Sequence, residues 1–140
     1  MPDKAPLPAE ITQGATLRHK EHGWSISLFP EAVAKAQSMG YGCLGGTFEF
    51  WLDPGFGDYE IYWLDAESRE RMQGEPWDDY ARRSCSEVLE KFQGLVSTTD
   101  FRKIASDQQL QIDLQKRLVF VADFVTEADV ADLAKKISSP

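Results

Sequence analysis

Three small groups of residues in this 140-residue chain have types and spacings that could support metal binding or catalysis. The first is His19 and His22, an H-x-x-H pair that on a helix can share a metal ion. The pair falls in a predicted hairpin, however, where residues three apart point to opposite faces of a strand. Because no cysteine lies nearby in the sequence to complete a tetrahedral site, we expect no metal at these histidines.

The second group is Cys85 with the two arginines that precede it, Arg82 and Arg83. Neighbouring cations lower the pKa of a thiol and can activate it as a nucleophile. Cys85 also lies on the apolar stripe of a predicted helix, so we expect it in the core instead. Cys43 and Cys85 lack a CxxC spacing; they could pair in an oxidising compartment, but two small buried side chains are the simpler interpretation.

The third group is the carboxylates Asp53, Asp58 and Glu60, which could perform acid–base catalysis or hold Mg²⁺ or Ca²⁺. Their order differs from that of a calcium-binding loop. The glycine-rich run at 40–46 precedes a strand, whereas a phosphate-binding loop follows a strand and opens a helix. We interpret the run as a helix stop and a flexible strand entry. The sequence therefore predicts no catalytic residue, no metal and no cofactor.

Two hairpins are predicted in the first half of the chain. The first spans 15–28, with Gly23 closing its turn, and a short helix that starts at Pro30 follows it. The second hairpin turns at 53–57, between apolar–polar alternations on either side. On its return strand Tyr59, Ile61 and Trp63 share one face, which we expect to be core, as we do for Trp51 and Trp77.

Helices dominate the second half of the chain. The clearest one starts at Pro76, with apolar residues spaced by three and four up to a predicted stop at Gly94. Another helix around Phe101 is expected to be capped by Thr98 or Thr99. After a buried strand from Leu118, Thr126 and Asp129 form a capping-box pattern that opens the last helix.

Antiparallel strand pairs followed by helices predict an α+β fold. We expect an antiparallel sheet of about four to five strands packed by three to four helices. A length of 140 residues suits one domain, here assigned to residues 11–140. Residues 1–10, with three prolines, are predicted to form a loose extended arm.

The distribution of charge is the most informative feature for function. The 31 residues from Glu49 to Asp79 hold ten of the 23 acidic residues but only two of the 15 basic ones. With 13 acids and 13 bases, the remaining residues are neutral, so this segment carries the entire net charge of −8. Such a charge argues against direct binding to nucleic acid or to an anionic membrane surface. It favours a basic protein partner.

The same segment contains aromatic residues among its carboxylates. By strand alternation, Tyr62 and Glu60 lie on the outer face of the second hairpin. Aromatic residues surrounded by charge are typical of a protein-binding centre with a charged rim. The predicted partner-binding residues are Asp53, Asp58, Glu60, Tyr62, Asp65, Glu67, Glu70, Glu75, Asp78 and Asp79.

Residues 40–95 resemble the small immunity proteins of bacterial polymorphic and contact-dependent toxin systems. The resemblance rests on Gly45–Phe50, on Tyr59–Leu64 and on Gly74–Trp77 in a small, acidic, tryptophan-rich α+β domain, without a diagnostic motif. It implies an antidote that binds a cognate toxin domain in the cytoplasm and blocks its active site. Many such toxins are nucleases with basic clefts, which an acidic protein can occupy as a phosphate mimic.

Two other classes of function stay open on the sequence. One is a secretion chaperone or adaptor, which would bind apolar segments of an effector. The other is an enzyme or a small-ligand-binding domain, for which the sequence supplies no motif. The first residues lack the apolar stretch of a secretory signal, and the apolar run Leu118–Ala122 is far shorter than the roughly 20 residues of a membrane span. We therefore expect a cytoplasmic protein.

Overall fold

The computed structural model describes residues 6–53 and 56–138 of the chain, and it confirms the α+β prediction. Five strands form one antiparallel sheet in the order β1-β2-β5-β3-β4. The last strand in sequence, β5, therefore lies between the two hairpins. The strands are β1 (Thr16–Arg18), β2 (Glu21–Trp24), β3 (Gly42–Trp51), β4 (Asp58–Glu67) and β5 (Leu118–Val125).

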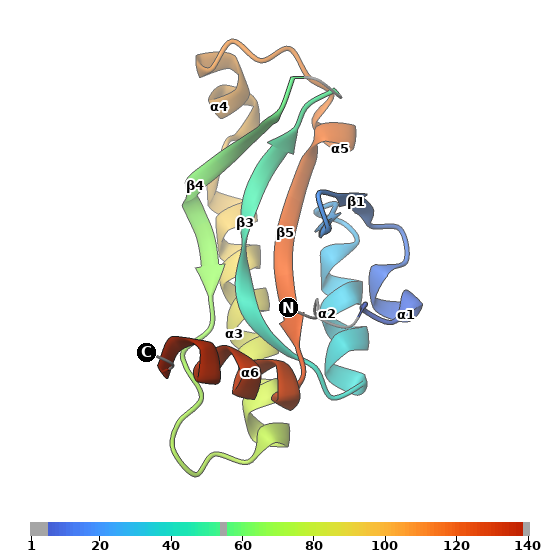
Figure 1. Cartoon of the computed structure of the whole chain (residues 1–140). Helices are drawn as coiled ribbons and strands as arrows, with labels where there is room; N and C mark the ends of the chain where they lie inside the picture. Colours follow the sequence, from blue (N-terminus) through green and yellow to red (C-terminus); the bar gives the residue numbers. More distant parts are fainter. Residues whose placement is uncertain (1–5, 54–55, 139–140) are drawn as a thin grey trace.

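Six helices are present in the described residues, and two of them are single turns of four residues. In Figure 1 the long helix α3 runs behind the sheet, whereas α6 crosses in front of it at the lower end. None of these helices combines the length and the apolar character needed to cross a bilayer. The helices are α1 (Ala9–Thr12), α2 (Phe29–Ser38), α3 (Trp77–Thr98), α4 (Phe101–Asp107), α5 (Leu114–Arg117) and α6 (Glu127–Ser138).

The core is a cluster of phenylalanine rings between the sheet and helices α2 and α3. Phe120 of β5 lies at its centre, with ring centroids 4.6 Å from Phe29, 4.8 Å from Phe48 and 5.0 Å from Phe92. All four rings are almost fully buried. Because alternate residues of a strand point to opposite faces, Thr47, Glu49, Val119 and Val121 point away from this core. We call the side of the sheet that carries them the open face.

Several local predictions are confirmed and others are wrong. The capping box is present: the Thr126 N–H donates to the Asp129 carboxylate at 2.8 Å, and the Asp129 N–H donates to the Thr126 hydroxyl at 3.2 Å. Helix α3 continues past Gly94, because one helical glycine costs only about 1 kcal/mol and the half-buried Leu95 continues the packing. Asp100, rather than Thr98 or Thr99, caps α4 by accepting from the Lys103 N–H.

The N-terminal region also differs from expectation. The first hairpin turns at His19 and Lys20, which both have positive φ, and Gly23 lies within β2. A Cβ at Gly23 would come within 2.9 Å of Val119, so the position serves packing and not the turn. Of the predicted arm, residues 1–5 lie outside the described part. Leu7 packs against the core and α1 begins at Ala9, so the described fold starts before residue 11.

Candidate functional site

The thiol of Cys85 is buried in the core, as predicted. Its Sγ donates to the Tyr41 carbonyl oxygen at 3.4 Å, and burial raises its pKa to about 12. A thiol with such a pKa stays protonated near neutral pH, and the thiolate is the reactive form. Neither Cys85 nor Cys43 forms a disulfide. The geometry therefore assigns Cys85 to packing.

The two histidines are separated by the turn. His19 is exposed in the turn itself, whereas His22 is half-buried on β2, with its ring centroid 5.9 Å from that of Trp24. Across the described residues, no three His, Cys, Asp or Glu side chains are grouped in a way that could hold a metal ion.

Of the three carboxylates Asp53, Asp58 and Glu60, two form ion pairs with arginines from other elements. Asp53 forms an ion pair with Arg117, and Asp58 forms one with Arg18 of β1. The Arg18 guanidinium also lies 5.2 Å from the ring centroid of Trp51, over a residue that is almost fully buried. Since two of the three carboxylates already have cationic partners, the group is poorly suited to bind Mg²⁺ or Ca²⁺.

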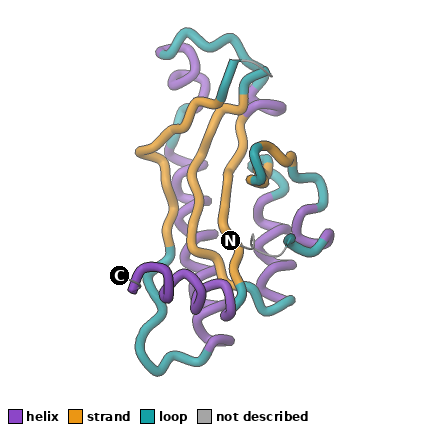
Figure 2. Tube along the Cα trace, viewed as in Figure 1, coloured by secondary structure: helices purple, strands orange, loops and turns teal. Residues whose placement is uncertain are grey.

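Glu75, one of the predicted partner-binding residues, is part of an internal network. It accepts two hydrogen bonds from the Arg83 guanidinium, at 2.9 and 2.8 Å, and one from the Met72 N–H at 3.0 Å. Arg83 also donates to Glu87 at 2.9 Å, and Glu87 accepts from Arg69 at 2.7 Å. This network fixes the loop between β4 and α3, which Figure 2 shows at the lower end of the molecule. Glu75 therefore stabilises its own loop.

Because of this network, we expect the stability of the protein to fall as the solution becomes acidic. Its hydrogen bonds, chiefly those from Arg83, lower the pKa of Glu75 from 4.5 to about 2. A carboxylate with a lowered pKa in the folded state stabilises the protein above its unfolded pKa, and this contribution is lost as the pH falls toward 2. We expect Glu75→Gln to reduce stability at pH 7 and to flatten the loss of stability below pH 4.5. Urea unfolding between pH 2.5 and 7 tests this; Glu90→Gln, an exposed change on α3, is the control. An unchanged acid-side slope in Glu75→Gln would contradict it.

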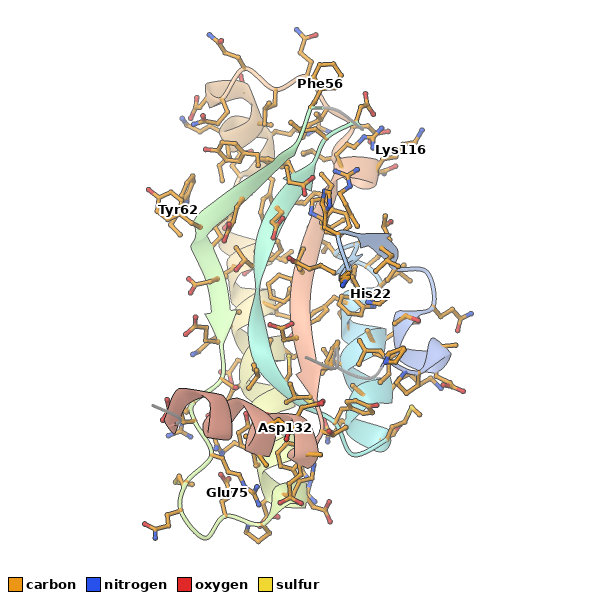
Figure 3. All side chains as sticks on the ribbon, in the orientation of Figure 1. His22, Phe56, Tyr62, Glu75, Lys116 and Asp132 are labelled. Carbon is orange, nitrogen blue, oxygen red and sulfur yellow. The ribbon has the colours of Figure 1, made fainter. Side chains whose placement is uncertain are left out.

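The other predicted residues fall into two groups at different places. In Figure 3, Glu75 lies at the lower end of the molecule and Tyr62 at the side. Phe56, in the turn between β3 and β4, marks the upper end. Glu70 belongs to the lower loop, and Asp78 and Asp79 to the first turn of α3 that follows this loop. Glu60, Tyr62, Asp65 and Glu67 belong to β4. The ten residues therefore do not form one continuous surface.

The open face of the sheet collects carboxylates from four strands instead. They line a hollow of about 590 Å³ whose floor includes Gly45, Gly46, Thr47 and Val121, and among the residues whose side chains the structure describes no lysine or arginine lines it. Its five carboxylates are Glu21, Glu49, Glu60, Glu67 and Asp123. We call this surface the acidic hollow. Only Glu60 and Glu67 were among the predicted residues.

Glu49 shows the effect of this concentration of negative charge. Burial raises the pKa of Glu49, and the neighbouring carboxylates of Glu21, Glu60 and Asp58 raise it further. A hydrogen bond from the Trp51 indole N–H, at 3.0 Å, opposes the shift. A negative charge close to a carboxyl group makes its ionised form less stable, and a nearby cation makes that form more stable. The acidic hollow is therefore electrostatically complementary to a positively charged group.

Of the three tryptophans predicted to be core, Trp51 is buried and Trp77 is half-buried, with its indole N–H donating to the Gly40 carbonyl at 2.8 Å. Trp63 is exposed over 47% of its surface, so that prediction is wrong. The reason is a bulge in β4: residues 61–64 lie opposite the single residue Phe48 of β3. The bulge reverses the alternation, so that Leu64 is buried and Tyr62 and Trp63 both point outward. Exposure of Tyr62 was predicted and is confirmed.

Comparison with protein-family models, with curated proteins and with solved structures finds no match to this chain.

Proposed function

We propose that this protein is a non-catalytic antidote of the bacterial cytoplasm, which binds a cognate toxin domain and covers the toxin's basic active-site cleft. The acidic hollow carries the proposal, because five carboxylates line it and none of its described lining residues is a lysine or an arginine. A toxin that acts on nucleic acid needs lysines and arginines in its cleft to bind phosphates. A surface of ordered carboxylates can occupy such a cleft in place of the phosphates, and the opposite charges accelerate the encounter.

The other chemistry of the molecule is consistent with this role. Cys85 is buried, and Asp53 and Asp58 are paired with arginines, so the candidate nucleophile and two of the three candidate acid–base carboxylates have structural partners. A chaperone for apolar segments would need a continuous apolar surface. The exposed large apolar side chains are instead the adjacent pair Tyr62 and Trp63 on β4, and Leu17, Met39, Phe56 and Met72 from four other parts of the described chain. This scatter favours the antidote over the chaperone.

Reversal of charge in the acidic hollow tests the proposal. We expect Glu60→Lys with Glu67→Lys to slow association with the toxin by about tenfold or more at low salt and to reduce the salt dependence of the association rate. Both residues are exposed on β4, and neither has an ion pair among the described residues, so the fold should tolerate the change. Asp58 is unsuitable because its reversal would break the contact with Arg18. The measurement is stopped-flow kinetics with the toxin domain encoded by the neighbouring gene.

Matched reversals on the helical side provide the control. Glu90→Lys with Asp107→Lys makes the same change in net charge on α3 and α4, and the Lys103–Asp107 ion pair that it removes is exposed on both sides and contributes little to stability. Asp113 is avoided because its carboxylate caps α5. Equal slowing by the two pairs would mean that only net charge matters and would overturn the assignment to the acidic hollow. If no neighbouring product binds, the antidote proposal itself fails.

A further inference from the structure

The bulge of β4 presents two adjacent aromatic side chains at the edge of the sheet. Thr47 pairs with Asp65 and Glu49 with Glu60, so four residues of β4 span the place of one residue of β3. Ile61 and Leu64, at the two ends of the bulge, are buried and fix it to the core. Tyr62 and Trp63 between them are 75% and 47% exposed. Figure 3 shows Tyr62 projecting sideways from the kink in β4. We call Tyr62 and Trp63 the aromatic corner.

Neither residue of the aromatic corner belongs to the hydrophobic core. Its two rings contact each other edge to face, with centroids 5.0 Å apart. The indole N–H groups of Trp24, Trp51 and Trp77 donate to Ile11, Glu49 and Gly40, respectively. Within the described residues the indole N–H of Trp63 has no such acceptor, nor has the Tyr62 hydroxyl a hydrogen-bond partner. A tryptophan and a tyrosine exposed together with unused polar groups are typical of a binding hot spot.

The bulge and the charges around it restrict what can dock there. A bulge interrupts the regular row of backbone groups that an added strand would need, and charged side chains on an edge strand have the same effect. Glu60 and Asp65 flank the aromatic corner, and both are exposed. A second copy of this chain would bring the same carboxylates against one another. The charge therefore favours a basic protein surface over strand addition or self-association.

We propose that the aromatic corner is the anchor of the complex, and that it enters an apolar recess of the basic partner whose rim carries arginine or lysine side chains. Glu60 and Asp65 would then face the cationic rim, while the two rings fill the recess and can stack against a guanidinium. The inference rests on the proposed function, since the partner is the same toxin domain. It adds Trp63, outside the acidic hollow, as a determinant of the lifetime of the complex.

Alanine substitutions at the corner test this role. We expect Trp63→Ala and Tyr62→Ala each to weaken binding to the toxin domain by about 30-fold or more, mainly through faster dissociation. Trp63→Phe should retain most of the affinity. Phe56→Ala is the control, because Phe56 is 77% exposed at the β3–β4 turn and should leave binding within about twofold. Urea unfolding of each variant verifies that stability is unchanged.

A spectroscopic measurement reports on the contact directly. Protein labelled with 5-fluorotryptophan should give one ¹⁹F resonance for each of its four tryptophans, and Trp63→Phe assigns that of Trp63. We expect the toxin domain to shift the Trp63 resonance and to leave that of the buried Trp24 unchanged. If the toxin binds while the Trp63 resonance does not move and the alanine variants bind normally, the anchor is wrong and the antidote proposal stands. If no toxin binds, both proposals fail.

Discussion

Replacement of Phe120 by alanine is expected to lower the free energy of unfolding by about 3–5 kcal/mol. Phe120 is fully buried in the middle of β5, and its ring contacts Phe29 of α2, Phe48 of β3 and Phe92 of α3. The substitution removes the ring that contacts both helices and the neighbouring strand. It leaves a cavity between the rings of Phe29, Phe48 and Phe92. Domains of this size are stable by about 5–15 kcal/mol, so the loss is a large fraction of the total.

Urea denaturation followed by tryptophan fluorescence measures this effect. Phe56→Ala is the control, because it deletes the same ring from an exposed position and should change stability by less than about 0.5 kcal/mol. A cost below about 1 kcal/mol for Phe120→Ala would show that the cluster collapses around the missing ring, and would contradict the central position assigned to it.

Gly46→Ala is expected to destabilise the protein by about 1–3 kcal/mol, although it adds only one methyl group. A Cβ at Gly46 would lie 2.5 Å from the Val121 carbonyl oxygen and 2.6 Å from Cε2 of Phe120. The oxygen belongs to the backbone of the neighbouring strand, so β3 and β5 would have to separate or Phe120 would have to leave its place. The glycine is required because the Phe120 ring lies directly against the β3 backbone.

The same substitution in α3 should have the opposite sign. A Cβ at Gly94 would meet nothing within 4 Å, and alanine is favoured over glycine in a helix by about 0.5–1 kcal/mol. We therefore expect Gly94→Ala to stabilise the protein while Gly46→Ala destabilises it, in the same urea assay. A neutral Gly46→Ala would mean that the two strands adjust to the methyl group without loss of packing.

Local patterns in the sequence predicted the elements better than they predicted how those elements meet. The capping box at Thr126, the helix that starts after Pro76 and the second hairpin depend on neighbouring residues, and all three are present. The glycine-rich pattern predicts a flexible strand entry at Gly46, because a close contact with Phe120, 74 positions later, leaves no local signal. Trp63 was placed in the core because alternation assumes a regular strand, and the β4 bulge breaks it.

The candidate site shows the same limit. The acidic segment predicted Glu60 and Glu67, but Glu21 and Asp123 enter the hollow only through strand pairing across the sheet. Each is one acid among a balanced set of charges in the sequence, so its own segment gave no reason to single it out. The segment also includes Glu75, whose arginine partner lies eight positions later. Several arginines lie at comparable distances in the sequence, so the sequence alone does not identify the partner.

The position of β5 has a consequence for how this chain reaches its folded state. The hairpin β1–β2 and the hairpin β3–β4 do not pair with each other, since β5 separates them. Until residues 118–125 have been synthesised, the backbone N–H and C=O groups of β2 and β3 that pair with β5 therefore lack their partner strand. Pairings between segments so distant in sequence form slowly, because closing the long loop costs conformational entropy before any stabilising contact forms. A nascent chain of this protein thus carries two unpaired strand edges while residues 52–117 are being synthesised, and unpaired strand edges promote aggregation and chaperone binding.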